Sequence, residues 1–228
     1  MSVFVIADLH LSLGTDKPMD VFRGWQDYVQ RLEKNWRALV QPDDTVVLAG
    51  DISWAMKLEE TTEDFSFLQR LPGRKWIIKG NHDYWWTTRR KMDRYLQQNG
   101  LTTIGFIHND AVAADGLALC GTRGWLLEAG GEADVKVRQR EAGRLRASLE
   151  AGRKTGLPPV AFLHYPPVYG NAVCRQIIDL LHEYGVRRCF YGHLHRPAAA
   201  KAFCGVYEGI NMQLIACDRL LFTPQKVI

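Results

Sequence analysis

The chain has 228 residues, of which 46% are hydrophobic, and a formal net charge of +4. This length suffices for one hydrophobic core and is short for two full domains, so we predict a single domain over residues 1–228. No run of about 18 apolar residues is present to span a bilayer. Because the first residues also lack the charged-then-apolar order of a signal peptide, we expect a cytoplasmic protein.

The first half of the chain predicts an alternation of strands and helices. Short apolar runs are typical of buried strands, and apolar residues at helical spacing indicate helices that pack on a sheet. The elements expected here are strands at 3–7, 45–49 and 75–78 and helices near 20–40, 58–70 and 87–98. This order favours a largely parallel sheet.

The second half predicts a further sheet. Turn signals at Asn109-Asp110 and Asp115-Gly116 indicate a hairpin of short strands between about 102 and 120. The elements that follow are a basic helix near 133–153, a strand at 160–163, a helix at 173–184, a strand at 188–191 and short strands over 199–223. Together the two halves predict an α/β fold, a two-sheet mixed β-sandwich flanked by helices.

Histidines and acids gather at the ends of five of the predicted strands. The fragments are Asp8-Leu9-His10, Gly50-Asp51, Gly80-Asn81-His82-Asp83, His164 and Gly192-His193-Leu194-His195. Because the carboxyl ends of the strands lie along one edge of an α/β sheet, distant fragments can meet there in one site. Imidazole and carboxylate together suit Mn, Fe or Zn, and six or more ligands exceed what one tetrahedral zinc needs. The pattern therefore predicts two metal ions.

This ordered set, with Gly-Asn-His-Asp in the middle, resembles the calcineurin-like metallophosphoesterase family, and within it the small stand-alone bacterial phosphohydrolases. The resemblance covers the chain from Asp8 to His195 and implies the family's fold, a sandwich of two mixed sheets flanked by helices. It implies one metal ion held by Asp8, His10, Asp51 and His195, and another held by Asp51, Asn81, His164 and His193. Asp51 would bridge the two ions, for which we favour manganese.

The resemblance also implies a reaction, the hydrolysis of a phosphate monoester or diester, with the diester slightly favoured. A hydroxide between two ions ~3.5–4 Å apart would attack phosphorus in line. His82 corresponds to the family's non-ligand histidine, which protonates the leaving oxygen or stabilises its charge. Trp54 stands where phosphoprotein phosphatases carry a second acid, so we expect Asp83 or a backbone carbonyl to orient His82.

The sequence indicates the type of reaction more clearly than it indicates the substrate. The ending Gly192 to Pro197 is also similar to lipid-A pathway pyrophosphatases, but those enzymes carry Arg where this chain has His82, so their lipid substrate is not carried over. We expect a small phosphorylated molecule. The candidate contacts with it are Arg123, Asn171, Trp54 and Tyr165, although aromatic residues at these places also serve to pack sheets.

Two other functions are compatible with the same residues. A nuclease or other nucleic-acid-processing phosphodiesterase would use the basic helix to bind phosphates, but the small net charge argues against it. A non-catalytic metal-binding scaffold would not need every ligand motif to be intact, as it is here. The sequence indicates no particular oligomeric state.

Overall fold

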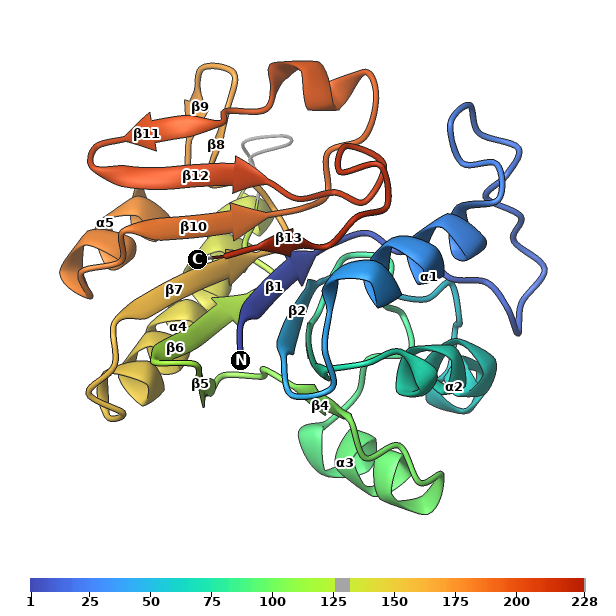
Figure 1. Ribbon diagram of the computed structural model, residues 1–228. Coiled ribbons are helices and arrows are strands. Elements are labelled where there is room, and N and C mark those ends of the chain that lie inside the picture. The colour runs from blue at the N-terminus through green and yellow to red at the C-terminus, as the bar shows by residue number, and fades with distance from the viewer. Residues whose placement is uncertain (126–131, 228) are drawn as a thin grey trace.

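Two β-sheets face each other in the computed structural model, which describes residues 1–125 and 132–227, and helices cover both outer sides (Figure 1). The first sheet consists of β1 (Val3–Ile6), β2 (Thr45–Ala49), β3 (Arg74–Ile78), β4 (Ile104–Phe106) and β13 (Gln225–Lys226), in the order β13-β1-β2-β3-β4. Strands β1 to β4 are parallel, and β13 pairs antiparallel with β1. The predicted parallel arrangement of this half is confirmed.

The second sheet has six strands. They are β5 (Ala111–Ala114), β6 (Leu117–Thr122), β7 (Pro159–Leu163), β10 (Arg188–Tyr191), β11 (Gly205–Tyr207) and β12 (Ile210–Leu214), in the order β11-β12-β10-β7-β6-β5. A short hairpin of β8 (Val168–Tyr169) and β9 (Ala172–Val173), which the sequence analysis did not predict, stands apart from both sheets. The predicted two-sheet mixed α/β sandwich is confirmed.

Helices α1 (Tyr28–Leu39), α2 (Thr62–Arg70) and α3 (Arg89–Gln98) lie on the first sheet, and α4 (Glu132–Arg153) and α5 (Arg175–Glu183) lie on the second (Figure 1). Of the helices in the two described ranges, none combines the length and apolarity needed to cross a membrane. The predicted helix at 20–40 starts too early. Gly24 has a φ of 94° and Asp27 a φ of 53°, values that a right-handed helix does not contain, so residues 20–27 form turns instead.

Strand β4 also differs from the prediction. It lies within the stretch expected to form the second sheet, yet it pairs with β3 and is the edge strand of the first sheet. Only β5 and β6 form the expected hairpin, through the turn at Asp115-Gly116. Apolarity alone does not indicate which sheet a strand joins, because β4 and β6 are both buried along their whole length.

The core has three layers because the strands alternate their side chains between two apolar neighbours. In β1, Val3 and Val5 point toward the opposite sheet, whereas Phe4 and Ile6 pack against the helices. Phe162 and Phe190 stack in the layer between the sheets, with ring centroids 5.6 Å apart. Packing between two rigid sheets leaves little room for relaxation, which fixes the relative position of their strand ends.

We expect Phe162→Ala to destabilise the fold by about 3–5 kcal/mol, because it leaves a cavity between two sheets that cannot collapse. Denaturant unfolding followed by circular dichroism measures the change. Phe22→Ala is the matched control, since Phe22 is 56% exposed and should cost less than about 1 kcal/mol. Equal losses for the two variants would contradict this account of the core.

Candidate dinuclear metal site

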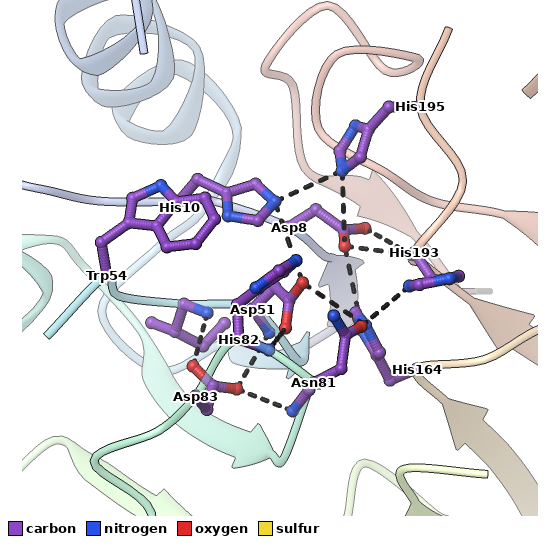
Figure 2. Close-up of polar contacts among 12 residues, drawn as sticks. Asp8, His10, Asp51, Trp54, Asn81, His82, Asp83, His164, His193 and His195 are labelled. Carbon is purple, nitrogen blue, oxygen red and sulfur yellow. Dashed lines mark hydrogen bonds and ion pairs between the residues drawn. The ribbon is translucent and has the colours of Figure 1, made fainter. Parts of the chain in front are cut away.

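The predicted ligands meet at the ends of five strands, as Figure 2 shows. Asp8 and His10 follow β1, Asp51 follows β2, Asn81 and His82 follow β3, His164 follows β7, and His193 and His195 follow β10. These strands run parallel within their sheets, and a parallel bridge between Ala7 and Ala216 joins the two sheets at this edge. The topology therefore brings residues from position 8 to position 195 into one cluster.

One group of donor atoms lies around His10. Its Nε2 lies 3.3 Å from His195 Nε2 and 3.9 Å from Asp51 Oδ2. Asp8 Oδ1 lies 3.8 Å from the same nitrogen of His195. Asp8, His10 and His195 are close enough to share one ion.

A second group lies around Asn81. Its Oδ1 lies 2.6 Å from His164 Nε2 and 2.8 Å from His193 Nδ1. Asp51 Oδ2 lies 3.5 Å from His164 Nε2. The same carboxylate oxygen thus faces both donor groups, as a bridging ligand requires.

The chemistry of this donor set fits metal ions. Burial lowers the pKa of His164 to about 3, and burial together with neighbouring imidazoles does the same for His193, so both rings are neutral and keep a free lone pair. Burial raises the pKa of Asp51 to about 6, and it raises the pKa of Asp8 as well. Two crowded carboxylates and several neutral imidazoles in the protein interior form a site that cations such as Mn, Fe or Zn would satisfy.

Four of these residues hold an unusual backbone conformation. Asp8, His10, Asp51 and His193 have φ values of 61°, 46°, 53° and 71°, in the left-handed region that non-glycine residues rarely adopt. Such strain is found mainly at functional sites, where surrounding contacts maintain it. The conformation turns each strand end sharply, so that its side chain faces the cluster.

Glycine is required beside two of the ligands because the loops approach each other closely. A Cβ on Gly80 would collide with the backbone and carboxylate of Asp51, and one on Gly192 would come within 2.5 Å of Asp8 Oδ2. The absence of a side chain at these two glycines therefore permits the close approach of the loops.

Asp83 has a different role from the expected one. Its buried carboxylate accepts hydrogen bonds from the backbone N–H groups of Asp51, Ile52 and Gly80, at 2.7–2.9 Å, and does not contact the His82 ring. His82 Nδ1 instead lies 3.2 Å from the Tyr84 hydroxyl. The hypothesis that Asp83 orients His82 was thus wrong, because the carboxylate is used to join two strand-end loops.

Two supporting contacts were not predicted from the sequence. Asp218 Oδ1 lies 3.0 Å from His195 Nδ1, and the Ala49 carbonyl lies 3.1 Å from His164 Nδ1. Each contact occupies Nδ1 and leaves Nε2 directed at the cluster. Asp218, like Asp8, lies shortly after a strand, and this position could have marked it as a candidate. Unlike Asp8, it has no histidine two residues away that would complete a recognisable motif.

The four candidate substrate residues fall into two pairs. Trp54 stacks on the His10 ring at a centroid distance of 4.9 Å, and the Tyr165 ring lies 4.1 Å from that of His193. Arg123 instead pairs with buried Glu141, and Asn171 is an exposed residue in the turn between β8 and β9. Of these four residues, the two aromatic candidates place their side chains against rings of the cluster.

A cavity of about 630 Å³ opens beside the cluster. His10, His82 and His195 line it, together with Asp218. Its outer lining is largely apolar and contains arginines, namely Met19, Phe22, Trp25, Trp54, Leu221, Arg23, Arg31 and Arg196. The cavity provides a binding surface for an organic group next to the metal site.

A family model described as calcineurin-like phosphoesterase matches residues 1–197. The chain therefore belongs to the calcineurin-like phosphoesterase family, as predicted, and is a metal-dependent phosphohydrolase of the class that uses a dinuclear metal centre. A search of curated proteins finds no significant match.

Several solved structures have a similar fold. A protein of unknown function, AQ665 from Aquifex aeolicus, is 15% identical, with a TM-score of 0.54 over 99% of this chain and 95% of that one. The phosphopantetheinyl hydrolase of Mycobacterium tuberculosis is 15% identical, with a TM-score of 0.53 over 100% and 95%. TT1561 of Thermus thermophilus is 13% identical, with a TM-score of 0.55 over 85% and 81%. At these identities, the similarity shows the fold alone.

We expect metal binding at pH 7 to release a proton from His195. Burial opposes the charge of this imidazole, but the hydrogen bond to Asp218 and the nearby carboxylates raise its pKa to about 9, so the metal-free protein carries the proton. Only the neutral ring binds a metal. The number of protons released on metal binding should therefore fall as the pH rises above about 9, where the metal-free ring is already neutral. Titration calorimetry in buffers of different ionisation enthalpy counts the protons.

Asp218→Asn tests the cause of this shift. The variant loses the carboxylate that raises the pKa of His195 and should release up to about one proton fewer at pH 7. Asp43→Asn, at an exposed position, is the control and should match the wild type. Equal proton counts for Asp218→Asn and the wild type would contradict the assigned pKa.

Proposed function

We propose that this chain is a dinuclear metal-dependent phosphoesterase that hydrolyses a small phosphodiester. The observation that supports it best is the position of Asp51 Oδ2, which faces both donor groups at 3.5 and 3.9 Å. In this proposal, Asp51 bridges the ions and the other six ligands divide between them. One ion is held by Asp8, His10 and His195, and the other by Asn81, His164 and His193.

Two metal ions bound there would lower the pKa of water to supply a nucleophile at neutral pH and would offset charge developing on the phosphoryl oxygens. The nitrogen–oxygen donor set accepts Mn, Fe and Zn, and we propose manganese. The protein's own contribution is to hold the ligands in place before the substrate arrives. The hydrogen bonds that the Asp218 carboxylate and the Ala49 carbonyl accept from His195 Nδ1 and His164 Nδ1 serve this purpose.

His82 is proposed to act on the leaving group. Its backbone N–H donates to Asp51 Oδ1 at 2.7 Å, which fixes the residue against the bridging carboxylate without using the ring. The Tyr84 hydroxyl lies beside Nδ1, and the ring packs 4.6 Å from Trp54 at the wall of the cavity. A proton on the ring can then pass to the leaving oxygen, or the ring can stabilise the charge that develops on it.

The preference for a diester rests on the cavity of about 630 Å³ beside His82. A phosphate monoester has one organic group on phosphorus. A diester has a second organic group, which the protein must accommodate. Phe22, Trp25 and Trp54 give the cavity an apolar aromatic lining, suited to an ester group with an apolar or ring-shaped body.

A nucleic-acid substrate has weaker support. Several arginines of α4 already pair with acids, as in Arg144–Glu141 at 2.7 Å and Arg153–Glu150 at 2.7 Å, which reduces the charge available to a phosphate backbone. A small phosphorylated substrate is therefore the proposal. Cleavage of DNA or RNA that weakens steeply with salt would favour the nuclease instead.

We expect metal-stripped protein to regain hydrolysis of p-nitrophenyl phosphate and bis-p-nitrophenyl phosphate when manganese is added. His82→Ala should lower kcat by about 10²–10⁴ while keeping both metals, because it removes a proton donor and no ligand. Asp51→Asn should lose activity together with bound metal. Colorimetric assays and metal analysis measure both effects.

His182→Ala is the control for His82→Ala, because His182 lies on α5 with a 38% exposed side chain, outside the cluster. It should behave as the wild type. Full activity in His82→Ala would remove the proposed role of that residue. Absence of turnover with both metals bound would favour the non-catalytic scaffold.

Phe22→Ala tests the diester preference. Phe22 lines the cavity without contacting a ligand, and its loss should raise the KM for bis-p-nitrophenyl phosphate about tenfold by removing apolar contact. The KM for p-nitrophenyl phosphate should change less. Val21→Ala, at a 70% exposed neighbour outside the cavity, is the control. Equal changes with both compounds would mean that the cavity does not hold the second ester group.

A further inference from the structure

A second cavity, of about 310 Å³, lies at the same edge of the sandwich on the side of β3, β4 and β6. Its lining follows the ends of these strands, with Lys79 after β3, His108 after β4 and Arg123 after β6. It shares no lining residue with the cavity of about 630 Å³. The strand ends of an α/β fold are the usual place for ligands, so this position is a candidate site.

Positive charge dominates the walls of this second cavity. Lys79, Arg123 and Arg144 all line it. The buried acid Glu141 accepts from both arginines, at 3.4 and 2.7 Å, and from the hydroxyl of Thr122 at 2.9 Å. One carboxylate between three cations leaves a surplus of positive charge facing the cavity.

Several polar groups at the cavity have no partner among the described residues. Arg123 Nε and His108 Nδ1 are buried and make no hydrogen bond within residues 1–125 and 132–227. Helix α3 begins beside the cavity at Thr88, whose side chain caps no backbone N–H, and its first turn contains no acid. A helix N-terminus of this kind favours negative charge through its dipole and its free N–H groups.

The cavity also adjoins the metal cluster through the backbone. Lys79 immediately precedes Gly80 and Asn81, and the carbonyl of Arg123 accepts the N–H of His164 at 3.1 Å. The first cavity is lined by His10 and His195, ligands of the other donor group. The two cavities thus lie next to different halves of the cluster.

We propose that the pocket formed by Lys79, His108, Arg123 and Arg144 binds a phosphate-type dianion at a site separate from the metal centre. Guanidinium groups donate to phosphate oxygens in a matched geometry, and the unpartnered donors supply further hydrogen bonds. Two sources share this chemistry. The anion is either a second phosphate of the substrate, which rests on the proposed hydrolytic function, or free inorganic phosphate.

The test is a calorimetric titration of the manganese-loaded protein with inorganic phosphate. The wild type should bind two phosphates, one at the metals and one in the pocket. Asn109→Asp adds a negative charge at the wall with almost no change of shape and should weaken the second binding event at least about tenfold. This titration requires no turnover, so its result does not depend on whether the protein hydrolyses the substrate.

Arg144→Ala provides a second variant with the same expected loss. It also removes a partner of buried Glu141, so Asn109→Asp remains decisive if Arg144→Ala does not fold. Arg146→Ala is the matched control, because Arg146 lies on the same helix, pairs with Glu183 outside the pocket and should still bind two phosphates. A single phosphate in the wild type, or two with unchanged affinity in Asn109→Asp, would overturn the proposal.

Kinetics distinguish the two sources of the anion. If the pocket holds a second phosphate of the substrate, Asn109→Asp should raise the KM for 1,3-propanediol bisphosphate by a larger factor than that for p-nitrophenyl phosphate. If it holds free phosphate, the variant should change the two KM values by the same factor. In both cases, weaker binding of the second phosphate by Asn109→Asp in the titration supports the proposed anion site.

Discussion

The buried carboxylate of Asp83 is the contact on which the arrangement of the site depends. It accepts N–H groups from Asp51 and Ile52 after β2 and from Gly80 after β3, and the Trp85 indole donates to it as well. Two strand ends that would otherwise be independent loops are thereby held in one geometry. The positions of Asp51, which we propose to bridge two metal ions, and of Asn81 depend on this single group, so the candidate ligand cluster is held in place by a residue outside it.

Two cavities with different linings adjoin the cluster. The cavity beside His10 and His195 combines aromatic and apolar side chains with three arginines, whereas the smaller cavity has Lys79, Arg123 and Arg144 in its wall and few exposed apolar side chains to match the first. A molecule centred on the metals could use both, with an organic ester group on one side and an anionic group on the other. The two cavities lie toward different edges of the first sheet, which ends at β4 on one side and at β13, next to β1, on the other.

Much of the fold and of the ligand set could be predicted from the sequence, since both depend on short-range patterns. Apolar runs located the parallel strands, and Asp8, His10, Asp51 and His193 follow directly after them. What the sequence did not reveal depends on distant partners. The assignment of β4 to the first sheet, the contact of Asp218 with His195 and the true role of Asp83 each involve a residue whose partner is set by packing. The early start predicted for α1 failed for a local reason, the left-handed Gly24.

The left-handed backbone at Asp8, His10, Asp51 and His193 has an energetic consequence for how a ligand is received. Each such residue costs on the order of 1 kcal/mol or more relative to an ordinary conformation, and the packing of the two sheets must supply that energy as the chain folds. Contacts within the protein, such as the hydrogen bonds that Asp83 accepts, help to hold these turns. An entering cation meets a preorganised cage and loses little of its binding free energy to rearranging the chain.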